Sequence, residues 1–285
     1  MGLAKEVFGK LGLIKSGLVS SAAASVMDFL LRLDIRLPEY VEGTEGGRMY
    51  LLQGDRVSFW IALTGTWEPR ETGLVRRTVK PGDVAVDIGA HIGYHTLILS
   101  KLVGENGRVY AFEPCAENFN LLKRNVEANA CKNVVIEQKA VSSRTGVAKM
   151  RGWAMEGSAS PVTTDGKSCY EVDVVRLDDY LKSGSVDFIK IDIEGHEYEA
   201  LKGSEEVLSR SESVRMITEF FPRLLRENGV APEDYLRFLA DRGFKLYEIS
   251  PDEEPLRPLN DIEAFLKAYQ GTEGIADLFC VKDSG

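Results

Sequence analysis

The sequence has few cysteines and no long run of apolar residues. Its four cysteines stand far apart without a Cys-x-x-Cys pair, which excludes the usual zinc and dithiol motifs and favours a reducing setting. No segment approaches the ~20 apolar residues of a membrane span, and residues 1–15 lack the apolar block and cleavage pattern of a signal peptide. Glu6 occupies the Ser/Thr position of the N-myristoylation pattern. We therefore expect a cytoplasmic protein without stable membrane insertion.

Basic residues are in the minority. The sequence contains 35 Lys and Arg residues and 44 Asp and Glu residues, which gives a formal net charge of −9. A nucleic-acid groove depends on clustered Lys and Arg, so we expect no nucleic-acid partner. The 285 residues, 44% of them hydrophobic, suffice for one α/β core and an extension.

A turn with two glycines follows the first strong strand pattern of the chain. The segment VAVDIGAHIG places Asp87 at the end of an apolar strand, with Gly89 and Gly93 in the turn before a helix. A second apolar strand, residues 108–112, ends at Glu113. In a doubly wound α/β sheet such strand ends line the ligand crevice, and an acid at the second one can accept hydrogen bonds from ribose hydroxyls. The pattern predicts a site for an adenosine-type cofactor.

The turn lacks a third glycine in register, so it departs from the G-x-G-x-x-G of dinucleotide sites. Asp87 would also repel a phosphate, whereas it suits a cation. S-adenosylmethionine carries a sulfonium and an ammonium group and no phosphate, so the turn favours it. His91, in the loop, is expected to contact this cofactor. An NAD(P)-type oxidoreductase or epimerase and an ordinary βαβ unit remain the alternatives.

The order of helix and strand patterns along the chain predicts an extension followed by one domain. In residues 1–75 we expect two amphipathic helices and a hairpin formed by 49–52 and 57–63. The helices would cover an edge of the core, form a homodimer contact or lie on a membrane surface. Residues 76–285 alternate strands and helices, which predicts a parallel sheet with helices on both faces. The expected strands are 84–88, 108–112, 134–139, 186–191 and 214–218, then a reversed hairpin of 244–249 and 277–281 at one edge.

The segment between the third and fourth core strands is less regular. Residues 147–150 and 170–175 read as an antiparallel pair, joined by a Gly/Ser/Thr-rich stretch at 157–168 that we interpret as a mobile loop.

Ionisable residues crowd the end of the fourth core strand, in the segment IKIDIEGHE. Lys190 is expected to pair with Asp192 or Glu219, and His196 is a candidate general base or a surface histidine at a helix start. Asp192 and Glu219 together would attract a divalent cation, but two carboxylates do not make a metal site, so we predict none.

These motifs resemble the FkbM-type S-adenosylmethionine-dependent O-methyltransferases. The resemblance covers roughly residues 65–250 and runs through TWEPRETGLVRRTVKPGDVAVDIGAHIGYHT, GRVYAFEPCAENFNLLKRNVEANACKNV, VDFIKIDIEGHEYEALKG and ITEFFPRLLRENG. It implies a class I methyltransferase fold, a seven-stranded sheet with one antiparallel edge strand. It also implies methylation of a hydroxyl on a small-molecule or glycan acceptor, namely a sugar, a glycan or a secondary metabolite.

The resemblance also implies roles for individual residues. Asp87 and Gly89 would face the methionine part of the cofactor, Glu113 the ribose and Ala140 the adenine, with Asn118 supporting the ribose end. Asp192 and Glu194 match the acidic motif of the family.

Proton removal from the acceptor hydroxyl is the catalytic task left to the protein. We assign it to His196 or Asp192, with Glu194 as the orienting residue. The segment 152–168 is a candidate to close over the acceptor. A non-catalytic binding module with the same fold is the remaining alternative.

Overall fold

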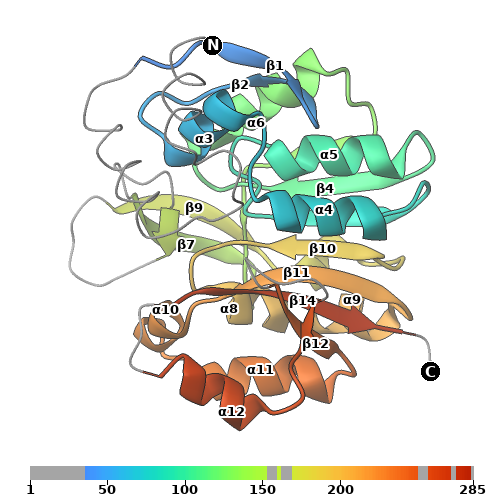
Figure 1. Ribbon diagram of the computed structural model, residues 1–285, viewed down its shortest axis with the longest axis vertical. Coiled ribbons are helices and arrows are strands. Elements are labelled where there is room, and N and C mark those ends of the chain that lie inside the picture. Colours follow the sequence, from blue (N-terminus) through green and yellow to red (C-terminus); the bar gives the residue numbers. More distant parts are fainter. Residues whose placement is uncertain (1–35, 153–158, 162–168, 250–255, 271–273, 284–285) are drawn as a thin grey trace.

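The structure is a computed structural model that describes residues 36–152, 159–161, 169–249, 256–270 and 274–283 (Figure 1). The two helices expected before residue 35, and the dimer contact assigned to them, lie outside these residues. So does most of the expected loop 157–168, but Ala159–Pro161 forms a short strand, β8. No helix in the described part of the chain is both long and apolar enough to cross a bilayer.

A mostly parallel sheet forms the centre of the described chain. Its eight strands are, in spatial order, β13 (Arg257–Pro258), β12 (Lys245–Ile249), β14 (Ala276–Lys282), β11 (Val214–Phe220), β10 (Phe188–Ile191), β3 (Val84–Ile88), β4 (Arg108–Phe112) and β5 (Val134–Glu137). From β11 to β5 all pairs are parallel, whereas β14 runs antiparallel to both β11 and β12. The expected class I α/β architecture is confirmed.

Two details of the predicted sheet were wrong. The reversed strand β14 lies between β11 and β12, not at the edge, and a two-residue strand, β13, makes an eighth. Leu278 and Cys280 of β14 are fully buried, so this strand needs hydrogen-bond partners on both sides. The exposed β13 includes Pro258, a residue that fits an edge strand because it has no N–H to donate.

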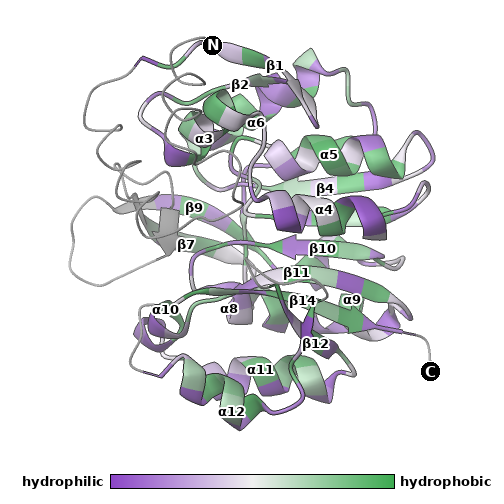
Figure 2. Ribbon diagram, viewed as in Figure 1, coloured by the Kyte–Doolittle hydropathy of each residue, from purple (hydrophilic) through white to green (hydrophobic). Residues whose placement is uncertain are grey.

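Helices cover both faces of the sheet. They are α3 (Arg56–Thr64), α4 (Pro69–Thr78), α5 (Tyr94–Val103), α6 (Ala116–Ala128), α7 (Leu177–Tyr180), α8 (Glu197–Lys202), α9 (Glu205–Arg210), α10 (Pro222–Glu227), α11 (Pro232–Asp241) and α12 (Ile262–Ala268). Successive residues of β3 point to opposite faces: Val86 packs with the cluster of α8, α9 and α11, and Ala85 with the cluster of α4, α5 and α6. Figure 2 shows the resulting pattern, with β10 hydrophobic along most of its length and hydrophilic toward its carboxyl end.

The predicted hairpin of residues 49–52 and 57–63 was wrong. Residues 56–64 form helix α3, and the hairpin is β1 (Tyr40–Thr44) with β2 (Gly47–Tyr50). The alternation of apolar residues in this segment imitates a strand, but the Asp55 side chain accepts a hydrogen bond from the Ser58 N–H and caps a helix. Helix α4 runs across the domain boundary placed at residue 75, which stays a prediction.

Two asparagines, Asn125 of α6 and Asn129 directly after it, attach the hairpin to the core. Asn125 accepts a hydrogen bond from the Tyr50 N–H at 2.6 Å, and its Nδ2 donates to the carbonyl oxygens of Tyr50 at 3.2 Å and Ile92 at 2.7 Å. Asn129 makes the same two-way contact with the backbone of Arg48, at 3.0 and 2.7 Å. The asparagines thus satisfy backbone groups of β2 and connect it to the turn after β3.

A second, four-stranded sheet follows β5. It contains β6 (Ala140–Val141), β9 (Cys169–Val175), β7 (Gly146–Gly152) and β8, in that order. The antiparallel pairing of β7 with β9 confirms the expected pairing of 147–150 with 170–175.

Candidate active site

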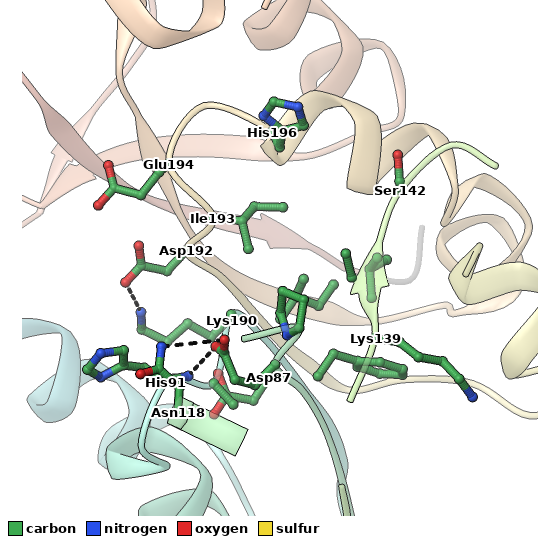
Figure 3. A pocket seen from close by; sticks show the side chains of 18 of the residues that line it. Asp87, His91, Asn118, Lys139, Ser142, Lys190, Asp192, Ile193, Glu194 and His196 are labelled. Atoms are coloured by element: carbon green, nitrogen blue, oxygen red, sulfur yellow. Dashed lines mark hydrogen bonds and ion pairs between the residues drawn. The ribbon is translucent and has the colours of Figure 1, made fainter. Parts of the chain in front are cut away.

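A cavity of 550 Å³ lies at the carboxyl ends of β3, β4, β10 and β11, and the small sheet contributes part of its wall (Figure 3). Its volume falls within the usual range for small-molecule sites, and its position is where doubly wound sheets bind ligands. Nine of the ten residues that the sequence assigned to cofactor binding or catalysis line it: Asp87, Gly89, His91, Glu113, Asn118, Ala140, Asp192, Glu194 and His196.

Gly93 does not line the cavity. It is the N-cap of α5 with φ of 94°, and a Cβ there would lie 2.7 Å from Leu122 Cδ1. Its glycine is therefore explained by the left-handed backbone and by the close packing of α6.

Glu113 is held in place by its own neighbourhood. Its Oε2 accepts a hydrogen bond from the His91 N–H at 2.9 Å, and its Oε1 accepts from the Cys115 N–H at 2.9 Å and from Asn118 Nδ2 at 3.5 Å. Burial raises the pKa of this carboxyl, while the positive field of His91 and these donors act in the opposite direction. A carboxylate has about four acceptor sites, so capacity remains for about one ribose hydroxyl beside these three donors.

Asp87 lies deeper, at the end of β3, and is almost fully buried. Its Oδ2 accepts a hydrogen bond from Thr96 Oγ1 at 2.6 Å. Burial raises the pKa of Asp87, and the nearby Lys190 and His95 counteract part of that rise. A cation in the cavity would stabilise the ionised form of this carboxyl, as the sequence argument requires.

Lys190 lies between two carboxylates (Figure 3 shows the contact with Asp192). Its Nζ is 2.8 Å from Asp192 Oδ2 and 3.5 Å from Glu68 Oε2. Burial opposes the charge on Lys190, but Asp192, Glu68 and Asp87 outweigh burial and hold its pKa well above the ordinary value. The expected pair of Lys190 with Asp192 is confirmed.

The sequence reasoning missed Glu68. This residue precedes α4 in the left-handed conformation, with φ of 44°, and His95 Nε2 lies 3.0 Å from its Oε2. Burial would raise its pKa, but Lys190 and His95 prevail and lower it to about 2. The only signal was its place before Pro69, at a helix start far from the strands that carry the site.

The loop after β10 is shaped by Glu197, which is fully buried. Its Oε1 accepts hydrogen bonds from the N–H groups of Ile193 at 3.2 Å and Gly195 at 3.1 Å. Glu194 and Gly195 adopt positive φ values of 53° and 91° inside this loop. Burial raises the pKa of Glu197 to about 7, against the effect of its hydrogen bonds. Glu197 therefore holds the backbone of this loop by hydrogen bonds, while Glu194 lines the cavity.

His196 begins α8 and faces the cavity, and burial lowers its pKa to about 4. Its Nδ1 lies 3.0 Å from Asn228 Nδ2. Glu219, at the end of β11, also lines the cavity, and its pKa is raised well above the ordinary value by burial and by Asp192. The described residues contain no group of three or more His, Cys, Asp or Glu placed to hold a metal ion.

Comparison with known proteins shows to which family the chain belongs. The model of the methyltransferase FkbM domain matches residues 87–246, which is more than half of the chain. The chain belongs to the FkbM methyltransferase family. The resemblance stated from the sequence is thereby confirmed, and the chain carries an S-adenosylmethionine-dependent methyltransferase domain.

Individual relatives are distant. The hexuronic acid methyltransferase AglP of Haloferax volcanii is 28% identical over 172 residues, which cover 59% of this chain and 66% of AglP. Methyltransferase sdnD of Sordaria araneosa is 25% identical over 196 residues, 56% of this chain and 73% of the relative. Among solved structures, methyltransferase FkbM from Methylobacillus flagellatus KT aligns with a TM-score of 0.42 at 17% identity, covering 79% of this chain and 53% of that one. The match to AglP thus spans less than two thirds of its length.

The residues of the cavity fit S-adenosylmethionine. Glu113 offers acceptor capacity for a ribose hydroxyl, and the acids Asp87 and Asp192 suit the positive charges of the methionine part. Ala140, Val174 and Met150 supply an apolar wall beside the second sheet, as an adenine ring requires.

Proposed function

We propose that this protein transfers a methyl group from S-adenosylmethionine to a hydroxyl group of a sugar or glycan. The observation that carries the proposal is that Glu113 and Asp192 line the same cavity. Glu113 is suited to bind the ribose, and Asp192 is suited to accept a hydroxyl proton. Family membership favours this chemistry over the dinucleotide oxidoreductase. The relative AglP is named as a hexuronic acid methyltransferase, which supports a uronic acid as acceptor. The exposed Arg144 at the cavity offers a cation for the carboxylate of such an acid.

S-adenosylmethionine supplies, when bound, a methyl group that its sulfonium charge already activates. The protein has to align the acceptor, exclude water and receive the hydroxyl proton. Asp192 is suited to the last task because Lys190 fixes its Oδ2, while its Oδ1 has no hydrogen-bond partner among the described residues. Glu194, two residues further along the same loop, is assigned to orient the acceptor.

Calorimetric titration with S-adenosylmethionine tests the cofactor site. We expect micromolar binding to the full chain, a loss of at least about tenfold in Glu113→Gln, and unchanged binding in Glu117→Gln, which alters an exposed residue of α6. NAD serves as the ligand control. Binding of NAD in place of S-adenosylmethionine, by folded protein, would overturn the proposal.

A panel of acceptors then tests the reaction. Labelled methyl transfer is measured with uronic-acid sugars and glycans and with their neutral counterparts, and we expect transfer to the acidic members. At saturating S-adenosylmethionine, Asp192→Asn should reduce the transfer rate by about 10²–10⁴-fold, so that weaker cofactor binding does not account for the loss. Tight cofactor binding without transfer to any sugar would contradict the sugar proposal and leave a secondary-metabolite acceptor or the non-catalytic module.

A further inference from the structure

Asn228, directly after α10, contacts two groups of the loop that follows β10. Its Nδ2 lies 3.1 Å from the carbonyl oxygen of Gly195 and 3.0 Å from Nδ1 of His196. A carbonyl oxygen only accepts hydrogen bonds, so the NH₂ group of Asn228 must face the loop. The opposite orientation of the amide would place two acceptor oxygens against each other.

The second hydrogen of this NH₂ group points to His196. Nδ1 of the ring therefore accepts a hydrogen bond and carries no proton. A neutral imidazole has one N–H, which must then be on Nε2. Burial lowers the pKa of His196 to about 4, so the ring is neutral at neutral pH. Nε2 has no hydrogen-bond partner in the part of the chain that the structure describes, and the residue lines the cavity (Figure 3).

We propose that Asn228 holds His196 in its Nε2–H form, so that the ring donates a hydrogen bond to an oxygen of the methyl acceptor and does not act as its base. The nature of that acceptor rests on the function proposed above, whereas the position of the proton does not. A general base needs an unprotonated nitrogen toward the substrate, and here the unprotonated nitrogen is the one bonded to Asn228. Of the two candidate bases expected from the sequence, this leaves Asp192.

The proton position can be measured without turnover. The chain has three histidines, so nitrogen-15 spectra of labelled full-length protein at neutral pH, compared with His196→Gln, assign the signals of His196. We expect an unprotonated Nδ1 and a protonated Nε2. A protonated Nδ1 with a bare Nε2, or a charged ring, would overturn the proposal.

Replacement of Asn228 tests its role as the positioning residue. Asn228→Asp substitutes an acceptor for the donor, and we expect the proton of His196 to move to Nδ1. Glu227→Gln, at the exposed neighbouring position, should leave the His196 signals unchanged. An unchanged Nε2–H form in folded Asn228→Asp would show that Asn228 does not set it. If that variant does not fold, the spectrum of the unaltered protein still decides the proton position.

The rate of methyl transfer distinguishes a hydrogen-bond donor at position 196 from a general base there. Glutamine at position 196 can donate a hydrogen bond through its amide but cannot take up a proton at neutral pH. We expect His196→Gln to keep the transfer rate within about tenfold and His196→Ala to lose about tenfold more, the effect of one hydrogen bond. A comparable loss of about 10²–10⁴-fold in both would identify a base and overturn the proposal. Absence of transfer in the unaltered protein would instead count against the proposed function, and the spectra would still decide the form of His196.

Discussion

The backbone oxygen of Asp192 lies only 2.0 Å from the point where a Cβ atom on Gly89 would stand. The two residues follow neighbouring parallel strands, and the Asp192 N–H donates to the carbonyl of Ile88 at 3.0 Å. The turn that is expected to hold the cofactor and the loop that carries the proposed base therefore touch through backbone atoms. Glycine at position 89 is what permits this contact.

Gly89→Ala should disturb both parts of the site at once. Its Cβ would also lie 2.8 Å from Ile193 Cγ2, and the φ of 85° is itself unfavourable for alanine by about 1–2 kcal/mol. Gly82→Ala is the matched control, since its φ is 94° but nothing lies within 4 Å. We expect Gly89→Ala to lose clearly more free energy of unfolding than Gly82→Ala and to bind S-adenosylmethionine at least about tenfold more weakly. Equal losses in urea unfolding would contradict the close contact.

The pair of Glu68 with Lys190 should stabilise the protein in a defined pH range. The pKa of Glu68 is about 2 in the folded protein against an ordinary value of 4.5, so its contribution is complete above 4.5 and is lost as pH falls toward 2. Glu68→Gln should lower the free energy of unfolding at neutral pH by up to about 3 kcal/mol, and this difference should shrink on acidification. Unfolding in urea across this range measures it, with the exposed pair residue Glu45→Gln as control. A difference independent of pH would exclude the ion pair as its cause.

Glu197 should have the opposite pH dependence. Its pKa of about 7, against an ordinary 4.5, means that the folded state holds a proton which the unfolded state releases between these values. The contribution of Glu197 to the free energy of unfolding is therefore complete below pH 4.5. It falls as pH rises through 7, by up to about 3 kcal/mol. Glu197→Gln should flatten the profile of unfolding free energy in this window, and the exposed Glu212→Gln should not. An unaltered slope in Glu197→Gln would show that another group titrates there.

Asn125 should be required for attachment of the N-terminal hairpin. It is fully buried and bonds the backbone of Tyr50 and Ile92, so Asn125→Ala leaves these groups unpaired. We expect a loss of at least about 2 kcal/mol in unfolding free energy and faster amide exchange at Met49 and Tyr50. Asn120→Ala, at an exposed position of the same helix, should be neutral or slightly stabilising. Unchanged exchange in the hairpin would contradict this anchoring role.

Much of the central sheet follows from local pattern. Residues 84–88 and 108–112 are short apolar segments that end at an acid, and they appear as β3 and β4 with the bounds expected. The failure at residues 57–63 has a local reason too, because apolar residues in alternation favour a strand, whereas the side chain of Asp55 caps a helix that begins at the next residue. The place of β14 inside the sheet was not readable, since nothing in its own residues says which strands it will pair with.

The sequence by itself determined the fold class, the family and the strand ends at which Asp87, Glu113 and Asp192 gather. It could do so because parallel strands expose their carboxyl ends at one edge, whatever the details of packing. Only the tertiary structure decided the state of these groups. Glu68 reaches Lys190 from a distant helix start, and Asn228 reaches His196 from the end of α10. Protonation depends on burial and on partners across space, and neither is encoded in the spacing of residues along the chain.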